Sequence, residues 1–211
     1  MIKAQKQFTK KLLITCLLLL SIITLSSCKE EEKTLNDVIA IGYIGDDIYL
    51  INSHNDSLLL EGFDLIQENI DEFMYFRKDG KYGYIDITGK EIIAPTYDKA
   101  YAIKEKKAVV VKDEIHYIID STGKELYKLP TNVTSNSYFS CNRLVVEKDG
   151  KFAYLIYNED TGTFTLPGEF TFDYALPFSE GYAVVGQETI VETEAGAPGE
   201  VSVKYNYLGL D

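Results

Sequence analysis

The sequence contains few of the residues that build metal or nucleophilic sites. It has only two histidines, His54 and His116, and neither a His-x-x-x-His pair nor a pair of cysteines spaced to hold zinc. It also lacks a Gly-rich phosphate loop, a Gly-x-Ser-x-Gly motif and an Asp-x-Asp-x-Asp-Gly calcium loop. These absences exclude the common sequence signatures of zinc, nucleotide, serine-hydrolase and EF-hand calcium sites. We expect no cofactor and no bound metal.

Positive charge is scarce in most of the chain. Four of the 21 Lys and Arg residues lie in the first 11 positions, ahead of any acidic residue. Residues 28–211 therefore keep 17 basic residues against all 33 acidic ones, a formal net charge of −16. Nucleic-acid phosphates and anionic lipids both require a basic surface, so the composition argues against either as a charge-matched partner.

A membrane-spanning run is also missing. The longest apolar stretch, Leu12–Leu25, has 14 residues and is interrupted by three hydroxyl residues, whereas a helix needs about 20 to cross a bilayer core. A basic start, a short apolar middle and the small residues Ser26 and Ser27 are typical of a secretory signal. We expect residues 1–27 to be a signal peptide, the alternative being an N-terminal anchor that is never cleaved.

Cys28 directly follows Leu25-Ser26-Ser27, and this tetrapeptide resembles the lipobox of bacterial lipoproteins. The resemblance implies cleavage before Cys28 and acylation of its sulfur with palmitate-like chains. A single acyl chain holds a protein only marginally, but lipoproteins of this kind carry more than one. The resemblance therefore implies stable attachment to the membrane through lipid on Cys28.

Residues 28–42 would then form a lipidated acidic tether. Its Lys29-Glu30-Glu31 resembles the signal that sends Bacteroidetes-type lipoproteins to the outer surface of the cell. The resemblance implies an outer-membrane protein exposed at the cell surface, with the periplasmic face as the alternative. Cys141 is the one thiol left once Cys28 is acylated, so no disulfide is expected within the mature chain. We expect Cys141 to be a small buried residue at a strand end.

A sequence pattern recurs at intervals of about 35 residues, which is the signature of a repeat architecture. Lys78–Asp86 is followed by Thr88-Gly89-Lys90-Glu91, and related segments begin at Lys112 and Lys148. The chain also carries a degenerate early copy, a late copy and a second element that occurs twice: Asp46–Asn52, Lys204–Leu208, Ala94–Ala100 with Ala108–Val110, and Phe170–Ala175 with Ala183–Val185.

Each unit reads as a small meander of two or three strands. Asp-Gly between apolar runs, as in Asp149-Gly150, predicts a tight hairpin turn, so Ala108–Val111 and Tyr82–Asp86 are predicted strands. Gly83, between large aromatics, permits a neighbouring backbone to approach closely. A short third strand starting at Glu91 should stop at Pro95.

This pattern resembles the WG repeat, also called the KWG repeat. Lys81–Asp86 carries the centre of the motif and Ser179–Val185 its first strand, and the resemblance covers about residues 43–211. It implies an all-β domain of tandem antiparallel meanders, solenoid- or propeller-like. The chain contains no Trp at all. Four other side chains occupy the Trp position, namely Tyr82, His116, Phe152 and Tyr205.

Two segments depart from the repeat. Residues 191–200 are poor in hydrophobic side chains, and we expect an exposed hairpin loop there. A single turn of helix is the other local expectation, around Leu65–Phe73, in an otherwise all-β chain.

The repeated acids are the main catalytic candidates, because two carboxylates suffice for glycoside hydrolysis. They recur because the repeat recurs, which favours a role in capping turns, and we assign no catalytic residue. His116 stands at an aromatic position and is interpreted as a packing residue, and His54 as part of a polar turn. The acids in question are Asp86, Asp98, Asp120 and Asp173.

Aromatic residues are abundant, with 16 Tyr and 10 Phe. Most should line the repeat core, and others can form a binding surface, since Tyr is enriched at interfaces. We expect a non-catalytic interaction module for protein or glycan at the cell envelope. The alternatives are a structural envelope lipoprotein without a specific ligand and a glycan-active enzyme.

Overall fold

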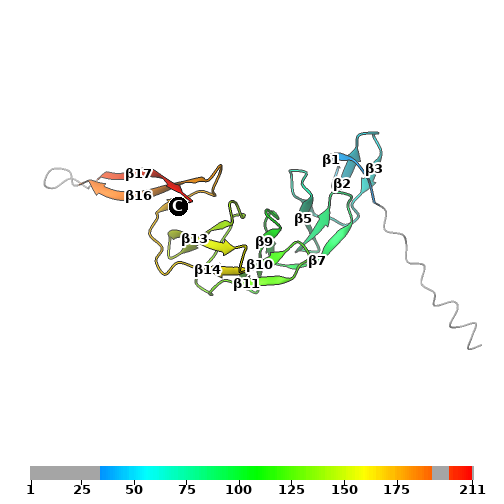
Figure 1. Cartoon of the computed structure of the whole chain (residues 1–211). Helices are drawn as coiled ribbons and strands as arrows, with labels where there is room; N and C mark the ends of the chain where they lie inside the picture. Colours follow the sequence, from blue (N-terminus) through cyan, green and yellow to red (C-terminus); the bar gives the residue numbers. More distant parts are fainter. Residues whose placement is uncertain (1–33, 192–199, 211) are drawn as a thin grey trace, which may run out of the picture. The chain divides into compact units, whose positions relative to one another are not determined.

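A computed structural model describes residues 34–191 and 200–210, and every regular element in these ranges is a β-strand (Figure 1). The expected all-β fold of tandem antiparallel meanders is confirmed. The strands form five sheets, which we name A to E in chain order. Sheet A holds β1 (Val38–Ile44), β2 (Asp47–Asn52) and β3 (Ser57–Leu59); sheet B holds β4 (Leu65–Ile66), β5 (Phe73–Lys78), β6 (Lys81–Asp86) and β7 (Glu91–Tyr97); sheet C holds β8 (Lys99–Ala100), β9 (Lys107–Lys112), β10 (Ile115–Asp120) and β11 (Glu125–Lys128); sheet D holds β12 (Arg143–Lys148), β13 (Lys151–Asn158) and β14 (Thr163–Thr165); sheet E holds β15 (Tyr174–Ala175), β16 (Tyr182–Val191) and β17 (Glu200–Gly209).

Within each sheet, every strand pairs with its neighbour in the sequence. The central hairpins turn where the sequence predicts. Asp79 and Gly80 have φ angles of 51° and 74°, and Asp149 and Gly150 have 51° and 75°. Positive φ at both central residues is the geometry that tight hairpin turns require, so the Asp-Gly signals are confirmed.

Neighbouring sheets pack face to face, and the inner sheets bury both faces. In sheet C, Val109 and Ile118 join a buried cluster with sheet D, while Val110 and Ile119 join one with sheet B. This alternation follows from the two-residue period of a strand, which points successive side chains to opposite faces. Similar clusters join sheets A and B and sheets D and E.

The strand that starts at Glu91, the last of sheet B, was expected to stop at Pro95, and this expectation is wrong. Strand β7 continues through Pro95 to Tyr97, and its register with β6 shifts on either side of Tyr84. Pro95 is tolerated because β7 is the edge strand and the ladder is irregular there. Gly83 has the role that the sequence indicates: a Cβ on it would lie 2.4 Å from the carbonyl oxygen of Ile93 and 2.8 Å from the Pro95 nitrogen.

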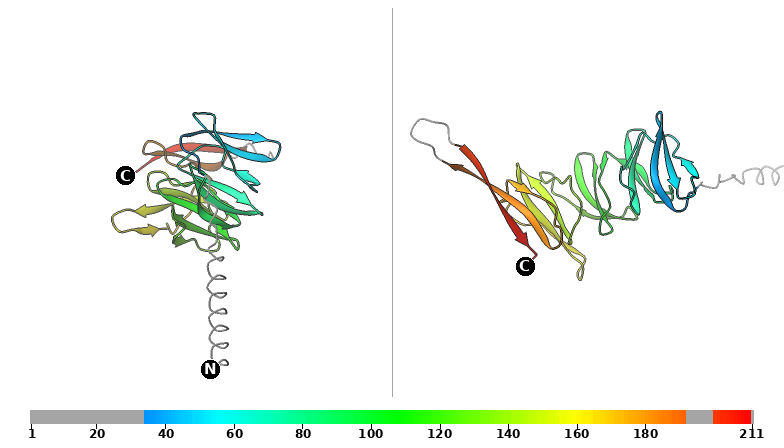
Figure 2. Two further views of the ribbon diagram at one scale, coloured as in Figure 1. Left: turned by 90° about the vertical axis from the view of Figure 1, so that its right-hand side faces the viewer. Right: turned by 90° about the horizontal axis from the view of Figure 1, so that it is seen from above.

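The expected boundary at residue 43 falls inside β1, so regular structure begins earlier, at Val38. Around Leu65–Phe73 the structure has the short strand β4 and irregular backbone, and the expected turn of helix is wrong. The predicted signal peptide (residues 1–27), Cys28 and residues 192–199 of the predicted loop lie outside the described residues. Strands β16 and β17 flank that loop. Their pairing runs from Val191 opposite Glu200 to Tyr182 opposite Gly209 (orange and red in Figures 1 and 2). Among the residues described, no helix is long and apolar enough to span a membrane.

Candidate binding surface

One tyrosine in sheet B and one in sheet D pack onto the sheet that follows. The Tyr84 hydroxyl donates a 2.7 Å hydrogen bond to the carbonyl of Tyr101, at the end of the first strand of sheet C. The Tyr154 hydroxyl donates one of the same length to the carbonyl of Leu176 beside sheet E. Burial raises the pKa of Tyr154 to about 12 and raises that of Tyr84 as well. Both side chains are therefore neutral donors that join one sheet to the next.

Tyr207 is the corresponding residue of sheet E, and its surroundings are the opposite. It holds the third place after the lysine in Lys204-Tyr205-Asn206-Tyr207, as Tyr84 does in Lys81-Tyr82-Gly83-Tyr84. Tyr84 is fully buried, but Tyr207 is 81% exposed. No strand that the structure describes follows sheet E.

Tyr207 belongs to a larger aromatic surface on sheet E. The strand register pairs Tyr207 with Val184 and Tyr205 with Gly186, which puts them on one face. Ala183, Val185 and Leu208 lie on the other face and pack against sheet D. We call the open surface the tyrosine face; it comprises Tyr174, Tyr182, Val184, Val203, Tyr205 and Tyr207.

The tyrosine face is held in a defined arrangement. The rings of Tyr174 and Tyr205 meet edge to face, with centroids 5.8 Å apart and planes at 89°. Gly186 lies beneath them, where a Cβ would come within 3.2 Å of the Tyr205 ring and 3.1 Å of Val203. Because glycine leaves this space free, the Tyr205 ring can lie against the strand. Rigid aromatic side chains lose little conformational entropy on binding, which favours a role in recognition.

A carboxylate makes a second kind of link between sheets, one that the sequence did not indicate. Glu105 lies in the turn before β9 and accepts hydrogen bonds from the amides of Cys141 (2.6 Å) and Asn142 (2.9 Å), in the turn before β12. Glu180 occupies the same turn position before β16, with φ of 50° against 51° for Glu105. Among the described residues, Glu180 has no such partner. Cys141 is half-buried and lies in the turn before β12, so the expectation of a small buried residue at a strand end is met only in part.

The four repeated acids bind turns and neighbouring strands. Asp86 accepts hydrogen bonds from the amide (2.9 Å) and hydroxyl (2.6 Å) of Thr88, and Asp120 does the same for Thr122. Each carboxylate thus closes its own turn.

The other two acids link successive repeat elements. Asp98 accepts the Asp113 amide at 2.8 Å and pairs with Lys81 at 2.5 Å. Asp173 accepts the Glu188 amide at 2.9 Å and pairs with Lys151. The lysine hydrogen bond holds the pKa of each carboxyl, Asp98 and Asp173, below its usual range. A general acid needs the reverse shift, so both groups are suited to structural ion pairs.

The two histidines are placed by backbone contacts. His116 is half-buried, with Nδ1 3.0 Å from the carbonyl oxygen of Ser135 and 3.2 Å from its amide nitrogen. Burial lowers the pKa of His116. The His54 amide donates to the side chain of Asn52 at 3.0 Å in an exposed turn. The ranges 34–191 and 200–210 contain no group of His, Cys, Asp and Glu side chains that could hold a metal ion.

Lys107 is the one buried lysine in the part of the chain that the structure describes. Its Nζ donates a 2.9 Å hydrogen bond to the carbonyl of Glu105 and lies 4.3 Å from the Tyr157 ring centroid. Burial lowers the pKa of Lys107. The ring and the carbonyl stabilise a cation there, which makes Lys107 a packing residue between sheets C and D.

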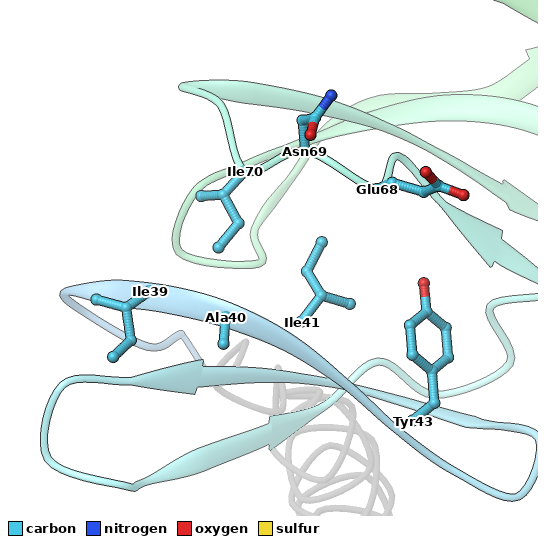
Figure 3. Close-up of a pocket in the computed structure, with 7 residues that line it drawn as sticks. All are labelled: Ile39, Ala40, Ile41, Tyr43, Glu68, Asn69 and Ile70. Carbon is cyan, nitrogen blue, oxygen red and sulfur yellow. The ribbon is translucent and has the colours of Figure 1, made fainter.

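One hollow in these ranges is shallow and is lined by both apolar and polar side chains. It has a volume of about 550 Å³ and lies between β1 and the segment that joins β4 to β5 (Figure 3). Figure 3 shows Tyr43 and the isoleucines of β1 on one side, with Glu68, Asn69 and Ile70 opposite. A single carboxylate and a single amide offer no pair for acid–base catalysis. A second hollow of about 340 Å³ lies beside Tyr97 and Tyr117.

Two segments of the chain, residues 82–114 and 169–188, match the sequence model of the family described as WG containing repeat. The first segment spans the junction of sheets B and C, and the second includes β15 and most of β16. These two segments are therefore similar to the WG repeat, as the sequence pattern indicated. A comparison with curated proteins finds no match.

Among solved structures, the chain is similar to Hsv2 of Kluyveromyces lactis (11% identity, TM-score 0.39, 63% of this chain and 46% of that chain covered). It is also similar to PorZ, a bacterial surface component of the type-IX secretion system of Porphyromonas gingivalis (12%, 0.41, 83% and 27%). A third similarity is to the Pan2 WD40 domain of Neurospora crassa (12%, 0.36, 81% and 62%). The chain spans less than two thirds of each of these proteins.

Proposed function

We propose that this protein is a non-catalytic interaction module, held at the cell envelope by lipid on Cys28, that binds a protein partner through the tyrosine face. One observation carries the proposal. Tyr207 takes the place that Tyr84 and Tyr154 occupy in their sheets, yet it is 81% exposed. A side chain that is buried between sheets elsewhere in the chain is here available to another molecule.

The chemistry of the face favours protein over glycan. Tyr84 and Tyr154 each combine an apolar ring against a sheet with a hydroxyl on a backbone carbonyl. Tyr207 offers the same pair of contacts, and a β-sheet partner supplies both. Tyrosine is enriched in interfaces because it combines a large apolar area with one polar tip.

The non-catalytic part of the proposal is supported by the repeated acids. All four carboxylates are engaged by turn amides, hydroxyls or lysines. An enzyme of the glycosidase type needs two carboxylates that are free to act on one sugar bond.

Attachment through Cys28 is supported by the charge of the chain. With a net charge of −16 after the predicted cleavage, residues 28–211 have no electrostatic attraction to an anionic bilayer. Covalent lipid supplies the hold instead, and Lys29-Glu30-Glu31 favours the outer surface of the outer membrane. Cys28→Ala should abolish palmitate labelling and release the protein from the membrane fraction, with Cys141→Ala as the matched control. Normal labelling and membrane retention of Cys28→Ala would rule out the anchor.

A photoreactive phenylalanine analogue at position 207 tests the binding surface in living cells. Position 138 is the matched control, since Tyr138 is 44% exposed and lies outside the tyrosine face. We expect protein adducts, identified by mass spectrometry, at position 207 and few at position 138. Adducts to polysaccharide would change the ligand class to glycan. Equal adducts at both positions, or none, would overturn the binding proposal.

A further inference from the structure

We infer that the tyrosine face binds sheet A of a second copy of this chain, so that copies associate head to tail. This inference rests on the proposed function, because it names the partner of the same surface. It follows from how the sheets pack inside one molecule.

Every junction between sheets joins two unlike faces. The forward face of a sheet carries the position of Tyr84, Ile118 and Tyr154, and it always packs on the next sheet. The rear face carries the position of Ile85, Ile119 and Leu155, and it always packs on the previous sheet. No junction in the described part of the chain joins two forward faces or two rear faces.

Within residues 34–191 and 200–210, two sheet faces have no other sheet packed on them. One is the forward face of sheet E, which is the tyrosine face. The other is the rear face of sheet A, where the strand register places Tyr49 opposite Gly42 and Leu59, and Ile51 opposite Ala40. The alternate residues Ile48 and Leu50 point the other way and are buried against sheet B.

The rear face of sheet A is apolar enough to be covered. Ile44 is 70% exposed, while Tyr49, Ile51 and Leu59 are half-buried. Gly42 leaves room for Ile51, whose Cδ1 lies 2.8 Å from the place of a Cβ on Gly42. Apolar surface of this kind marks interaction sites when it is contiguous.

The two side chains of sheet E that match the sheet-to-sheet hydrogen-bonding groups, Tyr207 and Glu180, have no such hydrogen bond among the described residues. Tyr207 and Glu180 stand where Tyr84 and Glu105 bind the next sheet, through a carbonyl and through two turn amides respectively. A second copy that docks its sheet A here continues the stack with the same unlike faces. Such a contact is heterologous, so it produces rings or open chains of copies rather than a symmetric dimer.

The orientation can be tested with two tagged forms of the full chain, co-expressed and solubilised in mild detergent. The tag follows Asp211 through a flexible linker. Tyr207→Asp blocks the tail and Ile44→Asp blocks the head; both side chains are largely exposed, so both variants should fold. Co-purification of one tag with the other is the readout, and Tyr138→Asp is the control, expected to pair like the native chain.

The head-to-tail arrangement predicts a specific pattern of pairing. Tyr207→Asp with itself and Ile44→Asp with itself should each lose pairing by about tenfold or more, while a mixture of the two variants keeps one intact interface and should still pair. High salt should strengthen pairing, because it screens the repulsion between two acidic chains.

Other patterns would overturn the inference. If Ile44→Asp pairs normally with itself and Tyr207→Asp pairs with nothing, the contact is tail to tail. If native copies do not co-purify at all, self-association is wrong. Should position 207 still form adducts with another protein in that case, the proposed function stands and only the partner named here is wrong.

Discussion

Tyr84 and Tyr207 hold the same position in their repeats, and they differ in what covers them. Sheet C packs on Tyr84 and buries its ring fully. The Tyr84 hydroxyl donates a hydrogen bond to the carbonyl of Tyr101, which directly follows the first strand of sheet C. Tyr207 keeps a similar local sequence but remains 81% exposed. The repeat therefore specifies a contact surface on each sheet, whether or not another sheet covers it.

The largest expected difference between the two positions is in stability. Tyr84→Ala should lower the free energy of unfolding by about 3–5 kcal/mol, because it leaves a cavity between two sheets. Tyr207→Ala should change it by no more than about 0.5 kcal/mol in dilute solution, since an exposed ring packs on little. Urea unfolding followed by circular dichroism measures both. Similar losses at the two positions would mean that sheet E is covered in the isolated chain.

Gly83 and Gly168 differ in how closely the neighbouring backbone approaches them. Gly83→Ala should cost about 2 kcal/mol or more, because its Cβ would meet the backbone of the bulged strand β7 at 2.4 Å. Gly168 has nothing within 4 Å of a Cβ, so Gly168→Ala is the control that should leave stability unchanged. Thermal unfolding of the two variants gives the answer. A neutral Gly83→Ala would show that β7 can move away from β6.

Glu105 and Glu180 hold the same turn position in their repeats, but Glu105 binds amides of the next sheet and Glu180 has no such partner among the described residues. Both stand in a left-handed turn conformation, so replacement by Ala changes the backbone energy equally. Glu105→Ala should also lose two amide hydrogen bonds to the next sheet and about 1 kcal/mol of unfolding free energy. Glu180→Ala should lose nothing further. Chemical denaturation compares them, and equal effects would argue that the Glu105 link contributes no stability.

The smallest expected effect is a pH dependence at the ion pairs. Asp98 has a pKa below its usual range because Lys81 binds the ionised form. Its contribution is present above the unfolded-state pKa of about 3.9 and is lost as pH falls through the lower folded-state value. Asp98→Asn should therefore reduce the fall in melting temperature between neutral and acid pH. Asp46→Asn, in the exposed turn after β1, should leave that fall as it is, and identical curves for all three chains would contradict the prediction.

Local signals in the sequence predicted much of this fold. Asp79-Gly80 and Asp149-Gly150 fix the hairpin turns through their φ angles, and the alternation around Gly83 identified both the strand and the close backbone approach. These features depend on residues a few positions apart, so one copy of the repeat contains the information. The path of β7 through Pro95 was missed because it depends on the irregular pairing with β6.

The sequence predicted that some tyrosines form a binding surface, but it did not predict which ones. The sequence indicated that some tyrosines would be exposed, but Tyr84, Tyr154 and Tyr207 share their local pattern. Their burial depends on the sheet that follows, which no residue near them specifies. The hydrogen bonds from Cys141 and Asn142 to Glu105 could not be predicted for a similar reason. They join residues that are 36 and 37 positions apart in the sequence.

The meander topology has a consequence for how the chain folds. Every strand pairs with its sequence neighbour, so each hairpin closes only a short loop and loses little chain entropy before its first hydrogen bonds form. Chains dominated by such local pairings fold faster than β proteins whose strands pair across long separations. Any of the five sheets can start the process, because each is built from pairings between strands that are neighbours in the sequence.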